Sequence, residues 1–399
     1  MSLPSLNQVT LKNKRVILRA DLNVPIKDGK ILDDSRITSL LPTIDYLCQK
    51  GASIVLISHF GRPKGKITSE MSLKQILPAL EKCWKKPIVF AEDCIGSQAQ
   101  QVAQNLKSGE IALLENLRFH PEEEENDPHF AQALAKLGDI YVNDGFAVSH
   151  RAHASVHAMT QYLPSFPGLL MTKEINALSQ ALQAPQRPLA AIIAGSKIST
   201  KLDLLKNLLN KVDVLMLSGG IANTFLKARN IEIGASLYEP SMLETTQKIE
   251  KLAREKQVEI VLPIDATGPL NAENFTTINL AHVPKEFKIL DIGPETVSLF
   301  STKLNQVRTL VWNGPLGVFE IPPFDQGTTA IAQKVAALSH HQQLFSIAGG
   351  GETLAALANA KSSNDFSYLS TAGGAFLEWL EGKNLPGIMA LMKSYPDAG

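Results

Sequence analysis

The sequence predicts an α/β protein made of two doubly wound domains with parallel sheets, joined by a hinge helix. Its length of 399 residues exceeds what one ordinary core holds and suits two domains. Short apolar runs alternate with amphipathic stretches, which is the order of elements in βαβ units. The runs are apolar almost throughout, as are strands that helices cover on both faces.

Five apolar runs in the first half are predicted strands, and they span residues 16–22, 53–58, 88–91, 111–115 and 140–143. The clearest helical patterns between them span residues 74–82 and 130–137. The second half repeats the alternation with strands at 189–194, 214–218, 260–263, 289–292, 310–312 and 344–348, and a weaker one near Tyr368. Its clearest helical patterns span 201–210, 240–255 and 328–338. Each half therefore reads as a Rossmann-like sheet with right-handed crossovers.

The boundary between the halves is predicted at residues 163–168, where two prolines and a glycine interrupt the pattern. Residues 171–182 then form the predicted connecting helix. We expect one domain over residues 1–168 and another from residue 169 onward.

Composition limits the classes of partner. Lys plus Arg and Asp plus Glu number 39 each, so no net charge draws the chain to nucleic acid or to a membrane surface. The polar N-terminus lacks an apolar export signal, and no apolar run is long enough to span a membrane. Cys48, Cys83 and Cys94 form no C-x-x-C pair, which favours structural thiols in a reducing cytosol over a catalytic cysteine. No cluster has the spacing of a zinc site, so we expect no bound transition metal.

Basic side chains follow the strands of the first half, where the carboxyl ends of a parallel sheet bind ligands. The set comprises Arg19, Arg36, Arg62, Arg118, Arg151, His59, His150 and His153. Arginine forks match carboxylate and phosphate oxygens. Any one of these arginines is better explained as a solvated loop residue or as the partner of a nearby carboxylate, but together they favour a site for a small polyanion. For the histidines, an orienting hydrogen bond or a surface position remains the stronger alternative.

The strands of the second half end in glycine-rich turns at residues 194–197, 218–220, 313–317, 349–353 and 370–374. Glycine lets the backbone approach a phosphate, although tight turns use glycine in any case. Lys197 and Lys201 suit phosphates or, equally, a solvated face. Glu352 suits Mg²⁺ or merely favours a helix dipole. The chain lacks both the Walker A motif and the G-x-G-x-x-G fingerprint, which disfavours P-loop enzymes and dehydrogenases.

An anion site on one domain and a nucleotide site on the other predict phosphoryl transfer with domain closure. Two rival readings are a dinucleotide-dependent dehydrogenase and a non-catalytic protein that closes on an anion. The missing fingerprint disfavours the first, and the missing export signal disfavours the second.

Several blocks of sequence resemble the signatures of the phosphoglycerate kinase family. They are RADLNVP (19–25), DSRITSLLPT (34–43), SHFGRP (58–63), LENLRFH (114–120), residues 143–153 and VWNGPLGVFE (311–320). Residues 195–202, DIGPE (291–295), 349–353 and 370–374 continue the resemblance, which runs from about Arg15 to Gly387. The chain departs from the family pattern at Thr200, Glu352 and Ala372.

The resemblance implies Mg²⁺-dependent, reversible transfer of a phosphoryl group between 1,3-bisphosphoglycerate and ADP, giving 3-phosphoglycerate and ATP in glycolysis and gluconeogenesis. It implies a cytoplasmic, hinge-closing monomer with no nucleic-acid or membrane partner. The N-terminal domain (1–168) would bind 3-phosphoglycerate, and residues 384–399 would pack back on it. The C-terminal domain (169–383) would bind the nucleotide.

The resemblance also assigns individual residues. The implied 3-phosphoglycerate contacts are Asp21, Leu22, Asn23, Arg36, His59, Phe60, Gly61, Arg62, Arg118 and Arg151. The implied nucleotide contacts are Gly195, Lys201, Gly219, Asn313, Glu320, Gly350, Gly351, Glu352 and Thr353, with Glu352 on the metal. Arg36, Lys197, Gly351 and Gly374 are the implied catalytic residues.

Overall fold

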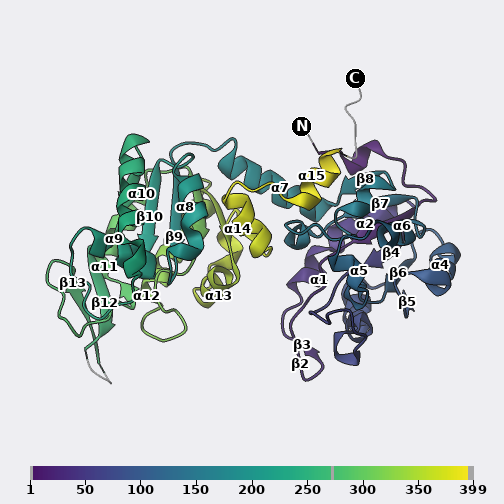
Figure 1. Ribbon diagram of the computed structural model, residues 1–399, viewed down its shortest axis with the longest axis horizontal. Coiled ribbons are helices and arrows are strands. Elements are labelled where there is room, and N and C mark those ends of the chain that lie inside the picture. The colour runs from purple at the N-terminus through teal and green to yellow at the C-terminus, as the bar shows by residue number, and fades with distance from the viewer. Residues whose placement is uncertain (1–2, 271–273, 394–399) are drawn as a thin grey trace. The chain divides into compact units, whose positions relative to one another are not determined.

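The structure, a computed structural model, describes residues 3–270 and 274–393 (Figure 1). The chain divides into two compact units. Unit 1 comprises Met1–Ile175 and Asn384–Gly399, and unit 2 comprises Asn176–Lys383. Residues 394–399, part of the segment expected to pack on the first domain, lie outside the described residues, as do residues 1–2 and 271–273.

Unit 1 contains a six-stranded parallel sheet in the order β5-β6-β4-β1-β7-β8. The strands are β1 (Arg15–Arg19), β4 (Ser53–Ile57), β5 (Ile88–Ala91), β6 (Ile111–Leu114), β7 (Ile140–Asn143) and β8 (Ser165–Pro167). A two-residue hairpin of β2 (Ile26–Lys27) and β3 (Lys30–Ile31) stands apart from it. The central strand β1 is buried at Val16, Ile17 and Leu18, which is why its sequence is continuously apolar.

Two predictions for this sheet need correction. Strand β1 ends at Arg19 rather than residue 22, because the chain turns there and the Leu22 amide donates to the Ser58 hydroxyl at 3.0 Å. The segment 163–168, predicted as a break, contains the edge strand β8, which pairs with β7. An edge strand tolerates the proline that argued against a strand here.

Helices cover both faces of the unit 1 sheet. They are α1 (Ser35–Ser39), α2 (Leu41–Gln49), α3 (Leu77–Trp84), α4 (Gly96–Asn105), α5 (Pro121–Glu124), α6 (Pro128–Ala135) and α15 (Pro386–Lys393). Helix α15 returns from the far end of the sequence to pack near Ser149. The Gly387 amide donates to the Ser149 carbonyl at 2.9 Å, and a Cβ on Gly387 would stand 2.6 Å from Val156 Cγ1.

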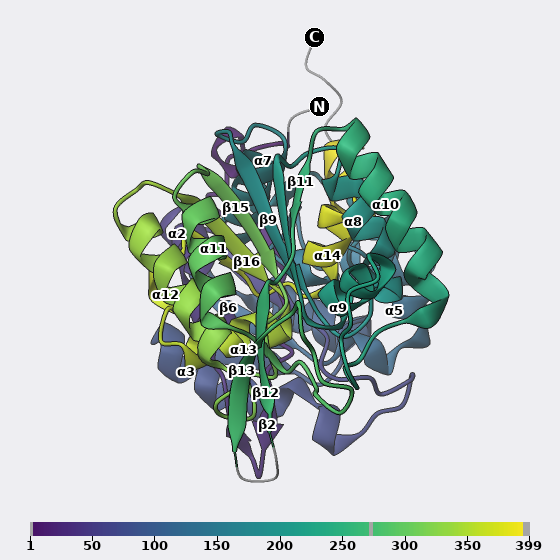
Figure 2. The ribbon, with the colours of Figure 1, turned by 90° about the vertical axis from the view of Figure 1, so that its left-hand side faces the viewer.

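Unit 2 contains a second six-stranded parallel sheet, in the order β11-β10-β9-β15-β16-β17 (Figure 2). The strands are β9 (Leu189–Ala194), β10 (Val214–Ser218), β11 (Glu259–Val261), β15 (Thr309–Asn313), β16 (Phe345–Gly349) and β17 (Tyr368–Ser370). The helices are α8 (Leu202–Leu208), α9 (Gly219–Ala228), α10 (Leu243–Glu255), α11 (Pro294–Leu304), α12 (Gln326–His340), α13 (Gly351–Asn359) and α14 (Gly374–Leu380). Helix α7 (Leu169–Leu182) begins in unit 1 and ends in unit 2, so the prediction of two parallel-sheet domains with a connecting helix is confirmed.

The run at 289–292 does not join the parallel sheet as predicted. Its strand β14 (Asp291–Ile292) pairs antiparallel with β12 (Asp265–Pro269), which also pairs with β13 (Phe275–Asn279). An apolar run reports burial and not the direction of the neighbouring strand. Asp291 and Ile292 are buried as expected, at the edge of a small antiparallel sheet, while Ile289 and Leu290 are half-buried.

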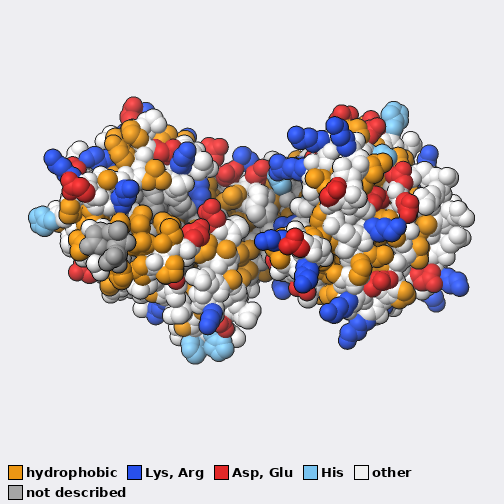
Figure 3. Space-filling model, turned by 90° about the horizontal axis from the view of Figure 1, so that it is seen from below, with side chains coloured by type: hydrophobic (Ala, Val, Ile, Leu, Met, Phe, Trp, Pro, Cys, Tyr) orange, Lys and Arg blue, Asp and Glu red, His pale blue; other side chains and the backbone are white. Residues whose placement is uncertain are grey.

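The topology places one candidate crevice in each sheet. In unit 1 the strand order reverses between β1 and β7, and in unit 2 it reverses between β9 and β15. Such switch points open a crevice beyond the carboxyl ends of the strands, where ligands bind. Elsewhere on the surface, the face in Figure 3 carries Lys and Arg interspersed with Asp and Glu on both units. Within residues 3–270 and 274–393, no helix combines the length and apolarity needed to cross a bilayer.

Candidate active site

The carboxyl edge of the unit 1 sheet gathers a basic cluster, which we define as Arg19, Arg36, Arg118, Arg151, His59 and His153. Burial, followed by the charges of Arg19, Arg118 and Arg36, lowers the pKa of His59 well below its usual value. Burial, followed by the charges of Arg118, Arg19 and Arg151, lowers the pKa of His153 to about 3. Each of the two histidines therefore lies within reach of three guanidinium charges, and both are neutral at neutral pH.

Arg36 is fixed by the turn that follows β1. It lies on α1, where its Nη1 donates to the Asn23 carbonyl at 2.7 Å and lies 3.0 Å from the Asp21 carboxylate. The Asn23 side chain in turn accepts from the Gly61 amide at 2.9 Å. These contacts lock the first two strand-end turns together while leaving 31% of the Arg36 side chain exposed. The guanidinium can therefore meet a ligand without losing its support.

Arg118 is more deeply held than Arg36. It lies on a 3-10 turn (Leu117–Phe119) that the Asn116 side chain caps. Its Nη1 donates to the Gly61 carbonyl at 2.8 Å, and its Nε lies 3.3 Å from the Glu124 carboxylate. The Asn116 side chain also accepts from the buried Phe60 amide at 3.1 Å. The predicted residues of three strand ends thus share one hydrogen-bond network.

The remaining predicted acid contacts are less tightly held. Arg151 is half-buried, and its Nε donates to the His150 ring at 3.2 Å. Arg62 is exposed on the turn after Gly61. Leu22 is buried, so only its backbone can serve a ligand.

A buried network beneath the basic cluster escaped the sequence analysis. Arg19, fully buried, donates from Nε to the Ser155 hydroxyl at 2.9 Å and from Nη2 to His59 Nδ1 at 3.2 Å. The Ser155 amide and hydroxyl donate to the Glu123 carboxylate at 2.9 and 2.6 Å. The Tyr141 hydroxyl donates to the Ser155 carbonyl at 2.6 Å. Because His59 Nδ1 accepts, the proton of the neutral ring is on Nε2.

Glu123 gave no signal in the sequence because it stands in a run of four glutamates, 122–125, which reads as a solvated segment. The structure buries Glu123 completely, while its neighbours Glu122 and Glu124 are exposed. Burial raises the pKa of Glu123, and the nearby Arg19 charge opposes that rise. A single buried carboxylate therefore faces the buried guanidinium through one serine.

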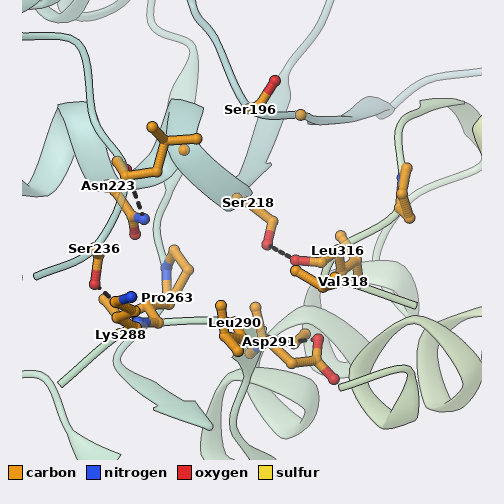
Figure 4. A pocket seen from close by; sticks show the side chains of 18 of the residues that line it. Ser196, Ser218, Asn223, Ser236, Pro263, Lys288, Leu290, Asp291, Leu316 and Val318 are labelled. Atoms are coloured by element: carbon orange, nitrogen blue, oxygen red, sulfur yellow. Dashed lines mark hydrogen bonds between the residues drawn. The ribbon is translucent and has the colours of Figure 1, made fainter. Parts of the chain in front are cut away.

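Unit 2 contains a pocket of about 510 Å³ beside the carboxyl ends of β9 and β10 (Figure 4). The predicted residues Gly195, Gly219, Glu320 and Glu352 line it. Outside the glycine-rich turns the lining is mostly apolar and includes Leu226, Leu237, Leu280, Leu290 and Val318, none of which was predicted as a site residue. Much of it comes from segments 235–237 and 280–292, which lie mostly in irregular loops, and of these only the run 289–292 has an apolar pattern in the sequence. A pocket of this size and character suits the flat base of a nucleotide.

Hydrogen bonds hold the walls of the pocket. The Ser218 hydroxyl donates to the Leu316 carbonyl at 2.6 Å, as the dashed line in Figure 4 shows. The Asn223 amide donates to the Leu237 carbonyl at 3.0 Å, and the Ser236 hydroxyl accepts from the Ile289 amide at 2.8 Å. These bonds join the end of β10, helix α9 and the irregular loops to one another, so the walls of the pocket are held in place.

A second group of predicted nucleotide contacts lies beside the pocket. Lys201 Nζ donates to Asn313 Oδ1 at 2.6 Å, and the Asn313 amide donates to the Gly349 carbonyl at 2.7 Å. Burial lowers the pKa of Lys201 to about 8, and the Glu352 charge opposes this. The Thr353 hydroxyl accepts a hydrogen bond from the backbone amide of Gly314, in the turn that follows β15, at 2.8 Å. These residues join three glycine-rich turns into one surface.

Of the three predicted catalytic residues of unit 2, Gly351 begins α13, and Lys197 and Gly374 belong to other segments. Lys197 is exposed, and its carbonyl accepts from the Thr200 hydroxyl at 2.9 Å. Gly374 is the exposed first residue of α14. Neither residue lines the pocket.

The glycines of unit 2 serve two different purposes. A Cβ on Gly220 or Gly314 would stand 2.1 or 2.0 Å from the backbone carbonyl oxygen of Ser196 or Ala194. These glycines are required by close packing of neighbouring turns, which was the alternative to phosphate binding. A Cβ on Gly351 would meet nothing within 4 Å, so no packing explains that glycine.

Gly350 and Gly351 therefore offer a matched pair of substitutions. Gly350 has φ +101° and a Cβ there would stand 2.7 Å from the Asn313 side chain, so Gly350→Ala is expected to lower the free energy of unfolding by about 1–3 kcal/mol. Gly351→Ala is expected to leave it unchanged or raise it by about 0.4–1 kcal/mol. Denaturant unfolding of both variants measures the difference, and equal destabilisation would contradict the prediction.

Comparison with known proteins gives consistent matches. Residues 6–383 match the family model described as phosphoglycerate kinase. The phosphoglycerate kinase of Methylorubrum populi is 50% identical over 385 residues, which cover 96% of each chain. That of a Caulobacter species (strain K31) is 49% identical over 394 residues, covering 98% of this chain and all of the relative.

Solved structures of the same description are also similar to this chain. Phosphoglycerate kinase from Coxiella burnetii superposes with a TM-score of 0.90 at 43% identity, covering 98% of this chain and 99% of that one. The enzyme from Pyrococcus horikoshii superposes with a TM-score of 0.82 at 32% identity, covering 98% of both chains.

Proposed function

The chain belongs to the phosphoglycerate kinase family, and we propose that its basic cluster binds the phosphorylated acid while the unit 2 pocket binds the nucleotide. The enzyme transfers a phosphoryl group between 1,3-bisphosphoglycerate and ADP, giving 3-phosphoglycerate and ATP in glycolysis. One observation carries the assignment of sites. Arginines and neutral histidines converge on one unit, and an apolar pocket with glycine-rich turns lies on the other.

We further propose the domains as residues 1–168 with 384–399 for the acid and 169–383 for the nucleotide. The contact of Gly387 with Ser149 supports the inclusion of the C-terminal segment in the first domain. Because α7 links the two units in the chain, we assign it as the hinge helix.

On the acid side, the guanidinium groups supply paired donors for phosphate and carboxylate oxygens. We assign these contacts to Asp21, Asn23, Arg36, His59, Arg62, Arg118 and Arg151, with backbone contributions from Leu22, Phe60 and Gly61. The neutral His59 donates a hydrogen bond from Nε2 and adds no further positive charge to a cluster that is already repulsive.

On the nucleotide side, we assign the base to the apolar lining and the ribose to Glu320, whose carboxylate accepts hydrogen bonds from hydroxyls. The phosphates then reach the group formed by Lys201, Asn313, Thr353 and the turns at Gly195, Gly219 and Gly350. The unpaired amides at the start of α13 favour anions.

Mg²⁺ fits the residues present. Glu352 is an exposed carboxylate in the first turn of α13, and it lines the pocket. Its negative charge acts to raise the pKa of Lys201. One carboxylate together with substrate phosphates is a usual Mg²⁺ environment. We assign Glu352 to hold the ion, which when bound neutralises phosphate charge.

For the transfer itself, we propose direct in-line attack of an ADP oxygen on the acyl phosphate, with no covalent enzyme intermediate. Arg36, Lys197 and the amides of Gly351 and Gly374 stabilise charge on the transferring group. The reacting atoms must come within about 3–3.5 Å, and we propose that domain closure meets this need and excludes water.

We propose that the enzyme is a cytoplasmic monomer whose partners are these small molecules, with no nucleic acid and no membrane. The equal numbers of acidic and basic residues support the absence of polyanionic partners. The three free cysteines support a reducing compartment.

Binding measurements on two variants test the division of sites. Arg118→Ala is expected to weaken 3-phosphoglycerate binding by tenfold or more, about 1.4 kcal/mol, and to leave ATP binding unchanged. Lys201→Met is expected to do the reverse. Calorimetric titration of each ligand into each variant gives the four values. If either variant weakened both ligands equally, the assignment of one site to each unit would be wrong.

The pKa of Lys201, lowered to about 8, predicts a pH dependence. Only the protonated amine attracts phosphate, and that form is lost as pH rises through 8. KM for ATP is therefore expected to be flat below pH 8 and to rise by about tenfold per pH unit well above it. Arginine stays protonated in this range, so Lys201→Arg should abolish the slope whatever its absolute KM. A slope that persisted in Lys201→Arg would assign the titration to another group.

A further inference from the structure

Three side chains with different metal-binding atoms meet at the edge of unit 1 formed by β5 and β6. They are Asp93, Cys94 and His120, and their candidate ligand atoms all lie within 4.8 Å of one another. Parallel pairing of Ala91 with Leu114 brings together segments that are far apart in the sequence. The spacing analysis could not detect this group, because the histidine lies 26 residues beyond the cysteine.

The surrounding structure holds these side chains in place. His120 Nε2 lies 2.7 Å from Asp93 Oδ1, and the His120 ring packs against Phe130 with centroids 5.2 Å apart. The Asp93 carboxylate also accepts the Cys94 amide at 2.6 Å. Cys94 is fully buried, while the side chains of Asp93 and His120 remain 47% and 26% exposed. The thiol is therefore the buried member of the group, and solvent reaches the group from the side of the carboxylate and the imidazole.

We infer that Asp93, Cys94 and His120 form a binding site for one divalent cation of the zinc class, distinct from the Mg²⁺ that accompanies the nucleotide. Thiolate, imidazole and carboxylate are together a donor set for zinc or cobalt, whereas Mg²⁺ takes oxygen ligands and avoids sulfur. Three protein ligands leave a fourth position for water. Metal–ligand bonds of about 2.0–2.3 Å place tetrahedral ligand atoms roughly 3.3–3.8 Å apart. Side-chain movements of about 1 Å would bring the three ligand atoms from their present positions to that separation.

The simpler account is that the aspartate and histidine form an ordinary ion pair above a buried thiol. That account explains the 2.7 Å contact and requires nothing of the sulfur. The two accounts differ in one respect. A bound cation requires a metal–thiolate bond, and an ion pair does not, so the sulfur decides between them.

Cobalt provides the probe, because a Co²⁺–thiolate bond gives a near-ultraviolet charge-transfer absorption. The full chain, treated with a chelator and returned to buffer with excess Mg²⁺, is titrated with Co²⁺ and then with Zn²⁺. We expect one equivalent of Co²⁺ to produce the thiolate band and Zn²⁺ to remove it. Cys94→Ser should abolish the band, and His120→Gln should weaken Co²⁺ binding by at least about 10–100-fold, the cost of losing even an outer partner.

Two matched controls keep the outcome decisive. Cys48→Ser and Cys83→Ser remove the other two thiols and should leave the band intact. Should Cys94→Ser fail to fold by circular dichroism, His120→Gln and Asp93→Asn at the partly exposed positions give the same test. No thiolate band at stoichiometric Co²⁺, a band that survives in Cys94→Ser, or displacement by Mg²⁺ would each overturn the inference.

Discussion

Replacing Arg36 with alanine is expected to lower kcat by about a hundredfold or more. The Arg36 guanidinium is held by the Asn23 carbonyl and the Asp21 carboxylate, yet part of it faces solvent. A preorganised charge of this kind stabilises the transferring phosphoryl group more than the ground state, so its loss appears in turnover. Steady-state kinetics with saturating ATP and 3-phosphoglycerate measure the effect.

Arg15 provides a matched control for Arg36. Each is an arginine paired with an aspartate, at 2.9 Å for Arg15 and 3.0 Å for Arg36, with side chains 29% and 31% exposed. Arg15, however, is the first residue of β1, so it lies at the amino end of the strand, whereas the basic cluster lies at the carboxyl end. Arg15→Ala should therefore keep kcat near that of the wild type. Similar turnover in the two variants would remove Arg36 from the catalytic group.

Replacing Glu123 with glutamine is expected to lower the free energy of unfolding of unit 1 by about 3–5 kcal/mol. The carboxylate accepts both donors of Ser155 and compensates the fully buried charge of Arg19. Glutamine has nearly the same shape but carries no charge, so Arg19 is left buried without its counter-charge. Hydrogen exchange resolved by peptide separates unit 1 from unit 2, where protection should not change.

Glu122→Gln is the control for Glu123, because the neighbouring side chain is exposed and should change stability by less than about 0.5 kcal/mol. Loss of Glu123 should also raise KM for 3-phosphoglycerate more than KM for ATP, since Arg19 positions His59. If Glu123→Gln left both stability and the KM for 3-phosphoglycerate unchanged, the buried network would have no supporting role.

The sequence predicted most of the parallel framework because burial on both faces leaves a signature. Strands β7 and β9 were predicted at their observed bounds, since each is a short apolar run between turns. The small antiparallel sheet was missed. Strand β12 contains glycine and proline, and β13 is largely exposed, so neither carries an apolar run. Its partner β14 was found as a strand but assigned to the wrong sheet.

The candidate site divides in the same way. The position of Arg36, Arg118 and Arg151 beyond the strands of unit 1 could be predicted, because parallel strands bring their carboxyl ends to one side of the sheet. The support beneath them could not, because whether a glutamate such as Glu123 is buried depends on tertiary packing. Part of the apolar lining of the unit 2 pocket was also missed, because loop residues such as Leu237 and Leu280 belong to no periodic run that would reveal their burial. The sequence therefore places polar residues that directly follow a strand, but it does not show which residues of the longer loops are buried.

The return of α15 to unit 1 has a consequence for the order in which the chain folds on the ribosome. Synthesis proceeds from the N-terminus, so all of unit 2 is made before Gly387 emerges to cover Val156 and Ser149. The whole sequence of unit 2 therefore precedes Gly387, whereas unit 1 cannot cover Val156 and Ser149 until the last residues of the chain have left the ribosome.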